Sequence, residues 1–180
     1  MNNDLFFFIR KGVINNMEVM IKKIYFDLDG VLADFDYAIY MFGGFKNGEC
    51  HDSEVKKTMK NTKHFFYKVP PNNLMIKCFH YFHKKEGDKC QILSALPDKT
   101  IKVYNAKKDK IAWVKKYLGC DVKVNLCYRH EKKKFCNGVG YILIDDYKKN
   151  INEWIAAGGT GVLYSKSMDN EVEELLQMLE

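Results

Sequence analysis

The sequence lacks several features that mark unusual classes of protein. Only 3 of its 180 residues are proline and 12 are glycine, which excludes collagen-like repeats and argues against a disordered chain. No apolar run approaches the roughly 20 residues that a membrane-spanning helix requires. The apolar stretch 5–9 is too short for the core of a signal peptide and is followed by no small-residue cleavage site. We therefore expect a cytoplasmic protein with no membrane partner.

Paired cysteines are also missing. None of the six cysteines lies in a Cys-x-x-Cys pair, so the sequence offers neither a zinc ribbon nor a redox dithiol. We expect reduced and mostly buried thiols at all six positions, which are Cys50, Cys78, Cys90, Cys120, Cys127 and Cys136.

Charge is unevenly distributed along the chain. The formal net charge is +6, but residues 167–180 contain five acids and no base, so the remainder has 29 bases against 18 acids. A basic body of this kind attracts phosphate-bearing ligands by raising their local concentration. Charge alone, however, is more typical of a solvated lysine-rich surface.

Apolar periodicity indicates strands that alternate with helices. Amphipathic helices have apolar residues at i, i+3, i+4 and i+7, as Met75, Cys78, Phe79 and Phe82 do. The predicted fold class is α/β, a Rossmann-like, mostly parallel sheet flanked by helices, because such alternation implies right-handed crossovers. The predicted strands are 22–28, 90–93, 122–126, 141–144 and 161–164, and the predicted helices are 36–42, 72–84, 107–118, 148–157 and a final helix on Val172, Leu175, Leu176 and Leu179.

Two pairs of carboxylates follow predicted strands. Asp27 and Asp29 end the first strand and point to the same side of an extended segment, while Asp145 and Asp146 end a later strand. Since function in a parallel sheet lies at the carboxyl ends of its strands, both pairs can meet in one crevice. The carboxylate oxygens there suit Mg²⁺ with a bound phosphate. Either pair alone is equally compatible with turn chemistry, but the two together favour the metal site.

The motifs around these pairs resemble those of a known superfamily. The segment DLDGVLAD, Ser94 in ILSALP, the lysines of RHEKKKF and LIDD occur in the order found in the haloacid dehalogenase-like phosphohydrolases. With FFYKVPP and KIAWVKKYLG, the pattern is similar to the 5′(3′)-deoxyribonucleotidase family and its small phage and bacterial relatives. The resemblance spans approximately residues 22–164.

This resemblance implies a division of the chain. Residues 20–35 and 72–180 would form the α/β core, residues 36–71 a small, mostly helical cap inserted after the first strand, and residues 1–19 an N-terminal extension. The cap is shorter than the family leads us to expect, which bears on nucleotide selectivity more than on phosphatase chemistry.

The resemblance also implies roles for the acidic residues. Asp27 would attack the phosphorus of a monoester and form an aspartyl-phosphate, and Asp29 would act as general acid and base. Asp27, the backbone carbonyl of Asp29 and Asp145 would hold Mg²⁺, with Asp146 in support.

Phosphate binding is assigned to Ser94 and one lysine. The family pattern of a lysine followed three residues later by an aromatic residue favours Lys132, although Lys133 and Lys134 are adjacent alternatives. Lys110 lies where some relatives have a helix lysine, but we interpret it as a solvated helix residue. Arg129 is a candidate for phosphate contact or a surface position.

Aromatic residues are candidates for contact with the leaving group. Phe35 follows the first motif directly, where the nucleotidase family presents an aromatic ring to the base. Phe45 and Phe65 could complete a stacking cage, but packing between cap and core explains the cluster 65–67 equally well.

The sequence therefore predicts a Mg²⁺-dependent phosphomonoesterase acting on a small phosphorylated substrate, most plausibly a deoxyribonucleoside monophosphate. Alternatives are a 3′-phosphatase on nucleic-acid ends, a phosphatase of sugar phosphates or other metabolites, and a catalytically silent nucleic-acid-binding module. A nucleic-acid partner is less favoured than a small substrate. Both Asp27 and Asp29, which a silent module would have no reason to keep, are present.

Overall fold

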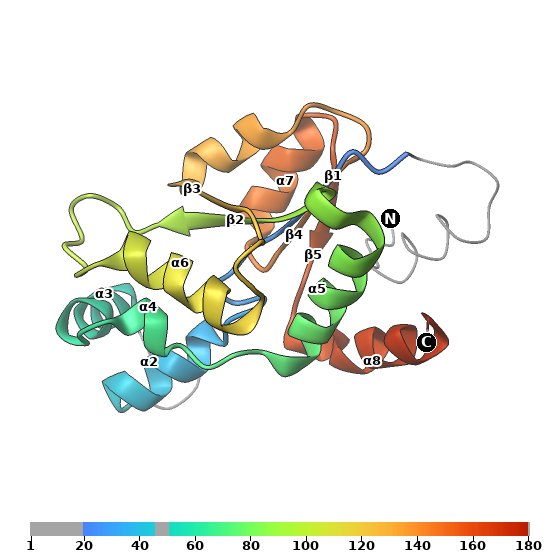
Figure 1. Ribbon diagram of the computed structural model, residues 1–180. Helices are drawn as coiled ribbons and strands as arrows, with labels where there is room; N and C mark the ends of the chain where they lie inside the picture. Colours follow the sequence, from blue (N-terminus) through green and yellow to red (C-terminus); the bar gives the residue numbers. More distant parts are fainter. Residues whose placement is uncertain (1–19, 46–50, 180) are drawn as a thin grey trace.

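A five-stranded sheet, in which every neighbouring pair of strands is parallel, forms the centre of the computed structural model (Figure 1). The structure describes residues 20–45 and 51–179. The predicted α/β, Rossmann-like fold is confirmed. The strands are β1 (Lys23–Phe26), β2 (Cys90–Leu96), β3 (Val124–Tyr128), β4 (Tyr141–Asp145) and β5 (Thr160–Leu163).

The order of the strands reverses between β1 and β4, and such a topological switch point is where ligands bind in a parallel sheet. The order is β3-β2-β1-β4-β5, so the chain moves outward from β1 on one side and then returns to pair β4 with the other side of β1. The connections leaving β1 and β4 therefore diverge to opposite sides, which opens a crevice at the carboxyl ends of these two strands. Asp27 directly follows β1 and Asp145 is the last residue of β4.

Helices cover both faces of the sheet. In β1 the alternation is clear, since Ile24 and Phe26 pack into the larger apolar cluster and Tyr25 into the smaller one with Trp154. The larger cluster lies under α5 (Asn73–Glu86), α6 (Ala106–Tyr117) and α8 (Asp169–Leu179), and the smaller one under α7 (Lys148–Ala156) (Figure 1). Short 3₁₀ helices are η1 (Gly87–Lys89), η2 (Arg129–Phe135) and η3 (Lys166–Met168).

The stripe predicted in the helix 72–84 is buried, whereas α6 also buries charged residues. Of the stripe predicted in the last helix, Val172 and Leu175 are buried and Leu176 is half-buried. Met75, Cys78, Phe79 and Phe82 of α5 all face the core, as predicted. α6 departs from a purely apolar stripe, because Ile111 is only half-buried. The buried face of α6 instead contains Trp113, Val114 and two charged residues, Asp109 and Lys110.

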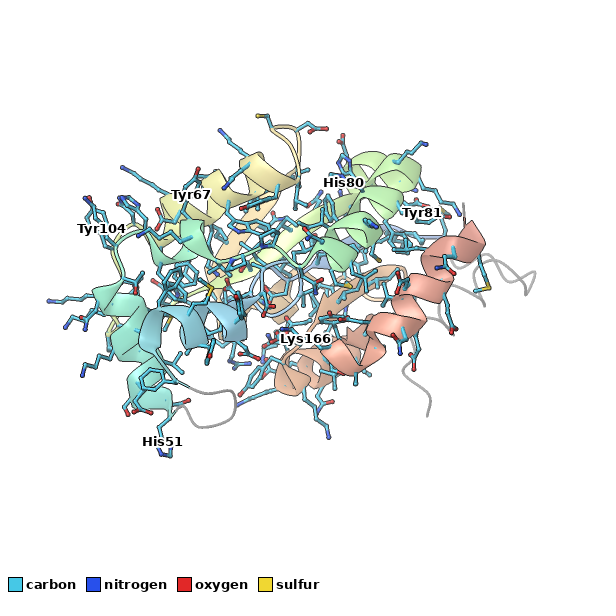
Figure 2. The ribbon with its side chains drawn as sticks, turned by 90° about the horizontal axis from the view of Figure 1, so that it is seen from below. His51, Tyr67, His80, Tyr81, Tyr104 and Lys166 are labelled. Atoms are coloured by element: carbon cyan, nitrogen blue, oxygen red, sulfur yellow. The ribbon has the colours of Figure 1, made fainter. Side chains whose placement is uncertain are left out.

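Within the predicted cap segment, residues 36–71, the structure has three helices in the described ranges 36–45 and 51–71. They are α2 (Phe35–Gly43), α3 (Asp52–Asn61) and α4 (Phe65–Lys68), so its mostly helical character is confirmed. The two ends of the segment meet at a bridge between Ala33 and Pro71. Asp34 caps α2 by accepting a hydrogen bond from the backbone N–H of Tyr37 at 3.2 Å. The Lys166 ammonium, labelled in Figure 2, contacts both carboxylate oxygens of Asp34 at 2.8 and 2.7 Å.

A few predictions need adjustment. β3 lies two residues later than predicted and β2 extends to Leu96, beyond the predicted end at Leu93. Of the five described cysteines only Cys78 and Cys90 are buried, and Cys50 and the predicted extension 1–19 lie outside the described residues. None of the helices in the described part of the chain combines the length and apolar character needed to cross a lipid bilayer.

Trp113 provides a test of how the predicted cap segment is joined to the core. Its ring is fully buried and its Nε1–H donates to the backbone carbonyl of Val69 at 2.8 Å. Trp113→Phe leaves that carbonyl unpaired and opens a cavity, so we expect the free energy of unfolding in urea to fall by about 2–4 kcal/mol. The control Tyr104→Phe, at a side chain that is 57% exposed, should change it by less than about 0.5 kcal/mol. Equal stability of the two variants would contradict this interpretation.

Candidate active site

A cleft of about 290 Å³ opens at the carboxyl ends of β1 and β4. Asp27, Asp29, Lys132 and Asp146 all line it. Ser94 of the neighbouring β2 is fully buried and accepts a hydrogen bond from the Lys110 ammonium at 2.9 Å. The structure thus brings together both carboxylate pairs that the sequence singled out. It does so because parallel strands end at one edge of the sheet.

Lys132 joins the two carboxylate pairs. Its ammonium lies 2.6 Å from Oδ2 of Asp27 and 2.7 Å from Oδ2 of Asp145, and its side chain is almost completely buried. Burial opposes the charge on Lys132, but the two carboxylates outweigh it and raise the pKa of Lys132. Of the three adjacent lysines, Lys132 is the one that enters the site, whereas Lys133 and Lys134 are exposed.

Asp145 is held by a chain of polar side chains. The Asn150 amide donates to both its carboxylate oxygens, at 3.1 and 2.9 Å, and the backbone N–H of Tyr147 donates at 2.8 Å. Arg129 in turn donates to the Asn150 oxygen at 3.2 Å and contacts Glu153. Sequence reasoning missed Asn150; its signal was its place in the first turn of the helix that follows the acidic pair. Arg129 lines the cleft, but these two contacts make it a support for Asn150.

Three carboxylates form a cluster that suits a divalent cation. Oxygens of Asp27, Asp145 and Asp146 lie within 4.8 Å of one another. Asp146 thus belongs to this cluster as much as Asp27 and Asp145 do. For Asp29 we predicted only a backbone carbonyl ligand to the metal, and its side chain pairs with Lys110 instead. The single positive charge of Lys132 does not neutralise three carboxylates that lie this close together.

Asp146 is a carboxyl group whose ionisation this cluster opposes. Although the residue is exposed as a whole, its carboxylate lies against Gly30, where a Cβ atom would come within 2.0 Å of Oδ2. Loss of hydration, together with the neighbouring Asp27 and Asp145 carboxylates, raises the pKa of Asp146 to about 8. A hard cation would relieve this repulsion, so the oxygen donor set fits Mg²⁺.

Lys110 is a second buried lysine at the site. Its ammonium donates to Ser94 Oγ at 2.9 Å and to the Ala95 carbonyl at 2.7 Å, and it pairs with the Asp29 carboxylate. It also lies 4.5 Å from the centre of the Phe66 ring. The prediction that Lys110 is a solvated helix residue is therefore wrong. The spacing of apolar residues along α6 does not reveal that Lys110 points toward Asp29 and Ser94.

The Asp29 carboxyl is set apart from the metal-type cluster. Burial raises its pKa, and the pull of Lys110 in the opposite direction does not overcome this effect. A carboxyl with a raised pKa retains a proton that it can donate, which suits a general acid.

The aromatic residues were only partly predicted. Phe35 lines the cleft, as expected of a residue that meets a substrate. Phe65 of α4 is fully buried in the larger apolar cluster, so its predicted contact with substrate is wrong. Its neighbour Phe66 lines the cleft instead. Phe45 packs against the core cluster and is absent from the cleft walls. Met59 of α3, which sequence reasoning did not consider, completes the apolar wall.

No model of a known protein family matches the chain, and no curated protein matches it.

Gly30 allows the acidic cluster to be tested without removing a carboxylate. Gly30→Ala would push the added methyl group into the Asp146 carboxylate, so we expect Mg²⁺ affinity, measured by isothermal titration calorimetry, to fall by about 10- to 100-fold. Gly44→Ala is the matched control: its φ of 71° resembles the 79° of Gly30, but no atom lies within 4 Å of the added Cβ. The same loss of Mg²⁺ affinity in both variants would show that backbone strain alone is responsible.

Proposed function

We propose that this protein is a Mg²⁺-dependent phosphomonoesterase that works through an aspartyl-phosphate. The observation that carries the proposal is Lys132 between Asp27 and Asp145, beside a separate Asp29–Lys110–Ser94 group. Asp29 of this second group lines the same cleft as Asp27 and Lys132. The two groups separate a nucleophile from an acid, as phosphoryl transfer through a covalent intermediate requires. The resemblance of the motifs to haloacid dehalogenase-like phosphohydrolases supports the same chemistry.

Asp27 is the nucleophile in this proposal. Its Oδ1 accepts the Leu28 backbone N–H at 2.7 Å and its Oδ2 contacts Lys132 at 2.6 Å, so the carboxylate has a fixed orientation at the cleft wall. One of its oxygens attacks phosphorus, the bond to the leaving oxygen breaks, and a mixed anhydride forms on Asp27. Asp27, Asp145 and Asp146 are the residues that would hold Mg²⁺, which would supply positive charge to offset the repulsion between carboxylate and phosphate.

Asp29 transfers the proton in both halves of the reaction. In its protonated form it gives the proton to the leaving oxygen, and it then takes a proton from the water that attacks the phosphorus of the intermediate. This attack releases inorganic phosphate and restores the Asp27 carboxylate. The raised pKa of Asp29 supports the first of these roles.

Lys110 and Ser94 are the groups that would receive the non-bridging phosphate oxygens. Without substrate, Lys110 is engaged with Asp29. An incoming phosphate competes with Asp29 for this ammonium, and when Lys110 moves to the phosphate, Asp29 loses the cation that favours its ionised form. Substrate binding would thus help to place the proton on Asp29.

The leaving group that fits best is a nucleoside. Phe35 and Phe66 line the cleft beside Met59, Leu96 and Pro97, which form an apolar wall suited to a flat base above a charged floor. A deoxyribonucleoside monophosphate is the leading substrate, and sugar phosphates and phosphorylated nucleic-acid ends are the alternatives.

Phosphate release from a substrate panel tests the proposal. The panel contains deoxy- and ribonucleoside 5′- and 3′-monophosphates, sugar phosphates and 3′-phosphorylated oligonucleotides, with and without Mg²⁺. We expect Mg²⁺-dependent turnover of deoxynucleotides, no turnover by Asp27→Asn, and a loss of about 10²- to 10⁴-fold in Asp29→Asn. Asp36→Asn, at an exposed position of α2, is the control and should retain full activity.

The pattern across the panel separates the alternatives. Activity confined to sugar phosphates or to oligonucleotide ends would keep the chemistry and change the substrate. Complete inactivity with Mg²⁺ would refute the enzyme and leave a silent binding module.

Lys110→Met tests the role that the sequence did not reveal. The substitution preserves much of the buried volume but removes the charge beside Asp29 and Ser94, so kcat/KM should fall by about 10²- to 10³-fold. Lys108→Met, at an exposed position of the same helix, should be neutral. If Lys110→Met retained kcat/KM while folding normally by circular dichroism, the phosphate would have to be held by other groups.

A further inference from the structure

Positive charge is concentrated at one end of the molecule. Residues 52–68, with α3 and α4, and residues 97–117, with α6, present eleven exposed lysines and only three carboxylates at the surface, Asp52, Glu54 and Asp98. We call this surface the basic end. Figure 1 shows α3, α4 and α6 together there, and α8, with four carboxylates and no base, at the other end.

The segments of the basic end contact one another. His64 and Asp109 pair at 2.9 Å across α4 and α6, and the His64 ring meets that of Tyr104 at 5.5 Å. The Lys116 ammonium lies 5.3 Å from the ring centre of Tyr67. The lysines of both segments therefore belong to one continuous surface.

Exposed aromatic rings accompany the lysines. The side chains of Tyr67 and Tyr104 are 40% and 57% exposed, and both lie at the end of the molecule away from α8 (Figure 2). Lys99 lies over the Tyr128 ring at 5.4 Å, and Tyr128 stacks on the exposed His130. Single-stranded nucleic acid is bound by lysines that contact its phosphates and by aromatic rings on which its unpaired bases stack. This surface offers both. An acidic protein segment would also match the charge, but it offers no series of flat bases to stack on the rings.

The basic end borders the cleft. Met59 of α3, Phe66 of α4, and Leu96 and Pro97 at the end of β2 belong to or adjoin the basic segments and also line the cleft. A single strand of nucleic acid bound along these lysines would therefore have its end beside Asp27 and Lys132.

We propose that the basic end binds single-stranded nucleic acid, with Tyr67 and Tyr104 as stacking platforms, and directs a phosphorylated end of the strand into the cleft. The binding surface stands on its own observations, while delivery of the end rests on the proposed phosphatase. The inference extends the substrate from a free nucleotide to a nucleotide at the end of a strand.

Binding is tested without any reaction. The full chain, in EDTA, is titrated into a fluorescently labelled oligothymidylate that has no terminal phosphomonoester, and anisotropy is followed from 50 to 300 mM salt. The logarithm of the binding constant should fall linearly with the logarithm of salt concentration, with a slope of about −0.7 for each phosphate neutralised.

Matched variants locate the surface. A triple variant should reduce the steepness of the salt dependence by about 2 units. It combines Lys60→Gln, Lys63→Gln and Lys107→Gln. The combination Lys77→Gln, Lys84→Gln and Lys123→Gln removes the same charge from exposed positions outside the basic end and should leave the slope unchanged. The double variant Tyr67→Ala, Tyr104→Ala should weaken binding by roughly 5- to 100-fold with no change in slope.

Several outcomes would refute binding of single-stranded nucleic acid by the basic end. These are a dissociation constant weaker than about 10⁻⁴ M at 50 mM salt, equal losses in the two lysine combinations, or equal binding of a duplex. Displacement by polyglutamate of equal charge, with no effect of the tyrosine variants, would indicate an acidic protein partner instead.

Delivery of the strand end is tested separately. Removal of the three basic-end lysines should lower kcat/KM for a 3′- or 5′-phosphorylated oligonucleotide by at least tenfold and spare that for the matching nucleoside monophosphate. Equal effects on both substrates would refute delivery. Oligonucleotide binding without turnover of any monoester would refute the phosphatase and leave the surface intact.

Discussion

The rest of the structure depends on the buried ammonium of Lys132 between Asp27 and Asp145. These carboxylates end the two central strands, β1 and β4, and without a cation between them they would repel each other across the crevice. Truncation of one partner in such a group typically costs about 3–5 kcal/mol, because it leaves an uncompensated buried charge. The same ion pairs therefore hold the sheet edge together and fix the carboxylate to which we assign nucleophilic attack.

A second lysine connects the predicted cap segment to the chemistry. Lys110 contacts Asp29 and Ser94 on one side and lies over the Phe66 ring on the other. Since Phe66 belongs to α4, the position of that short helix bears on the electrostatics around Asp29. The apolar wall and the charged floor of the cleft are thus parts of one packing arrangement, and the small cap contributes to both.

The sequence was informative wherever the signal was local. The places of β1 and β4 and the α5 stripe follow from short-range periodicity. Asp27 and Asp145 were recognised because each lies at the end of a predicted apolar strand. Lys110 was misjudged because the helix period cannot reveal that α6 turns charged residues toward a distant cleft. For the adjacent Phe65 and Phe66, only tertiary packing decides which ring is enclosed in the core and which one reaches the cleft.

The central claim, that Asp27 accepts the phosphoryl group, is tested most directly by mass spectrometry of an acid-quenched single turnover. The Asp29→Asn variant, in which hydrolysis of the intermediate is slowed, is mixed with Mg²⁺ and a deoxynucleoside monophosphate and digested at low pH. Our account predicts that the peptide containing Asp27 gains the mass of one phosphoryl group. Release of a stoichiometric amount of phosphate with no labelled peptide, or with the label on another residue, would contradict it.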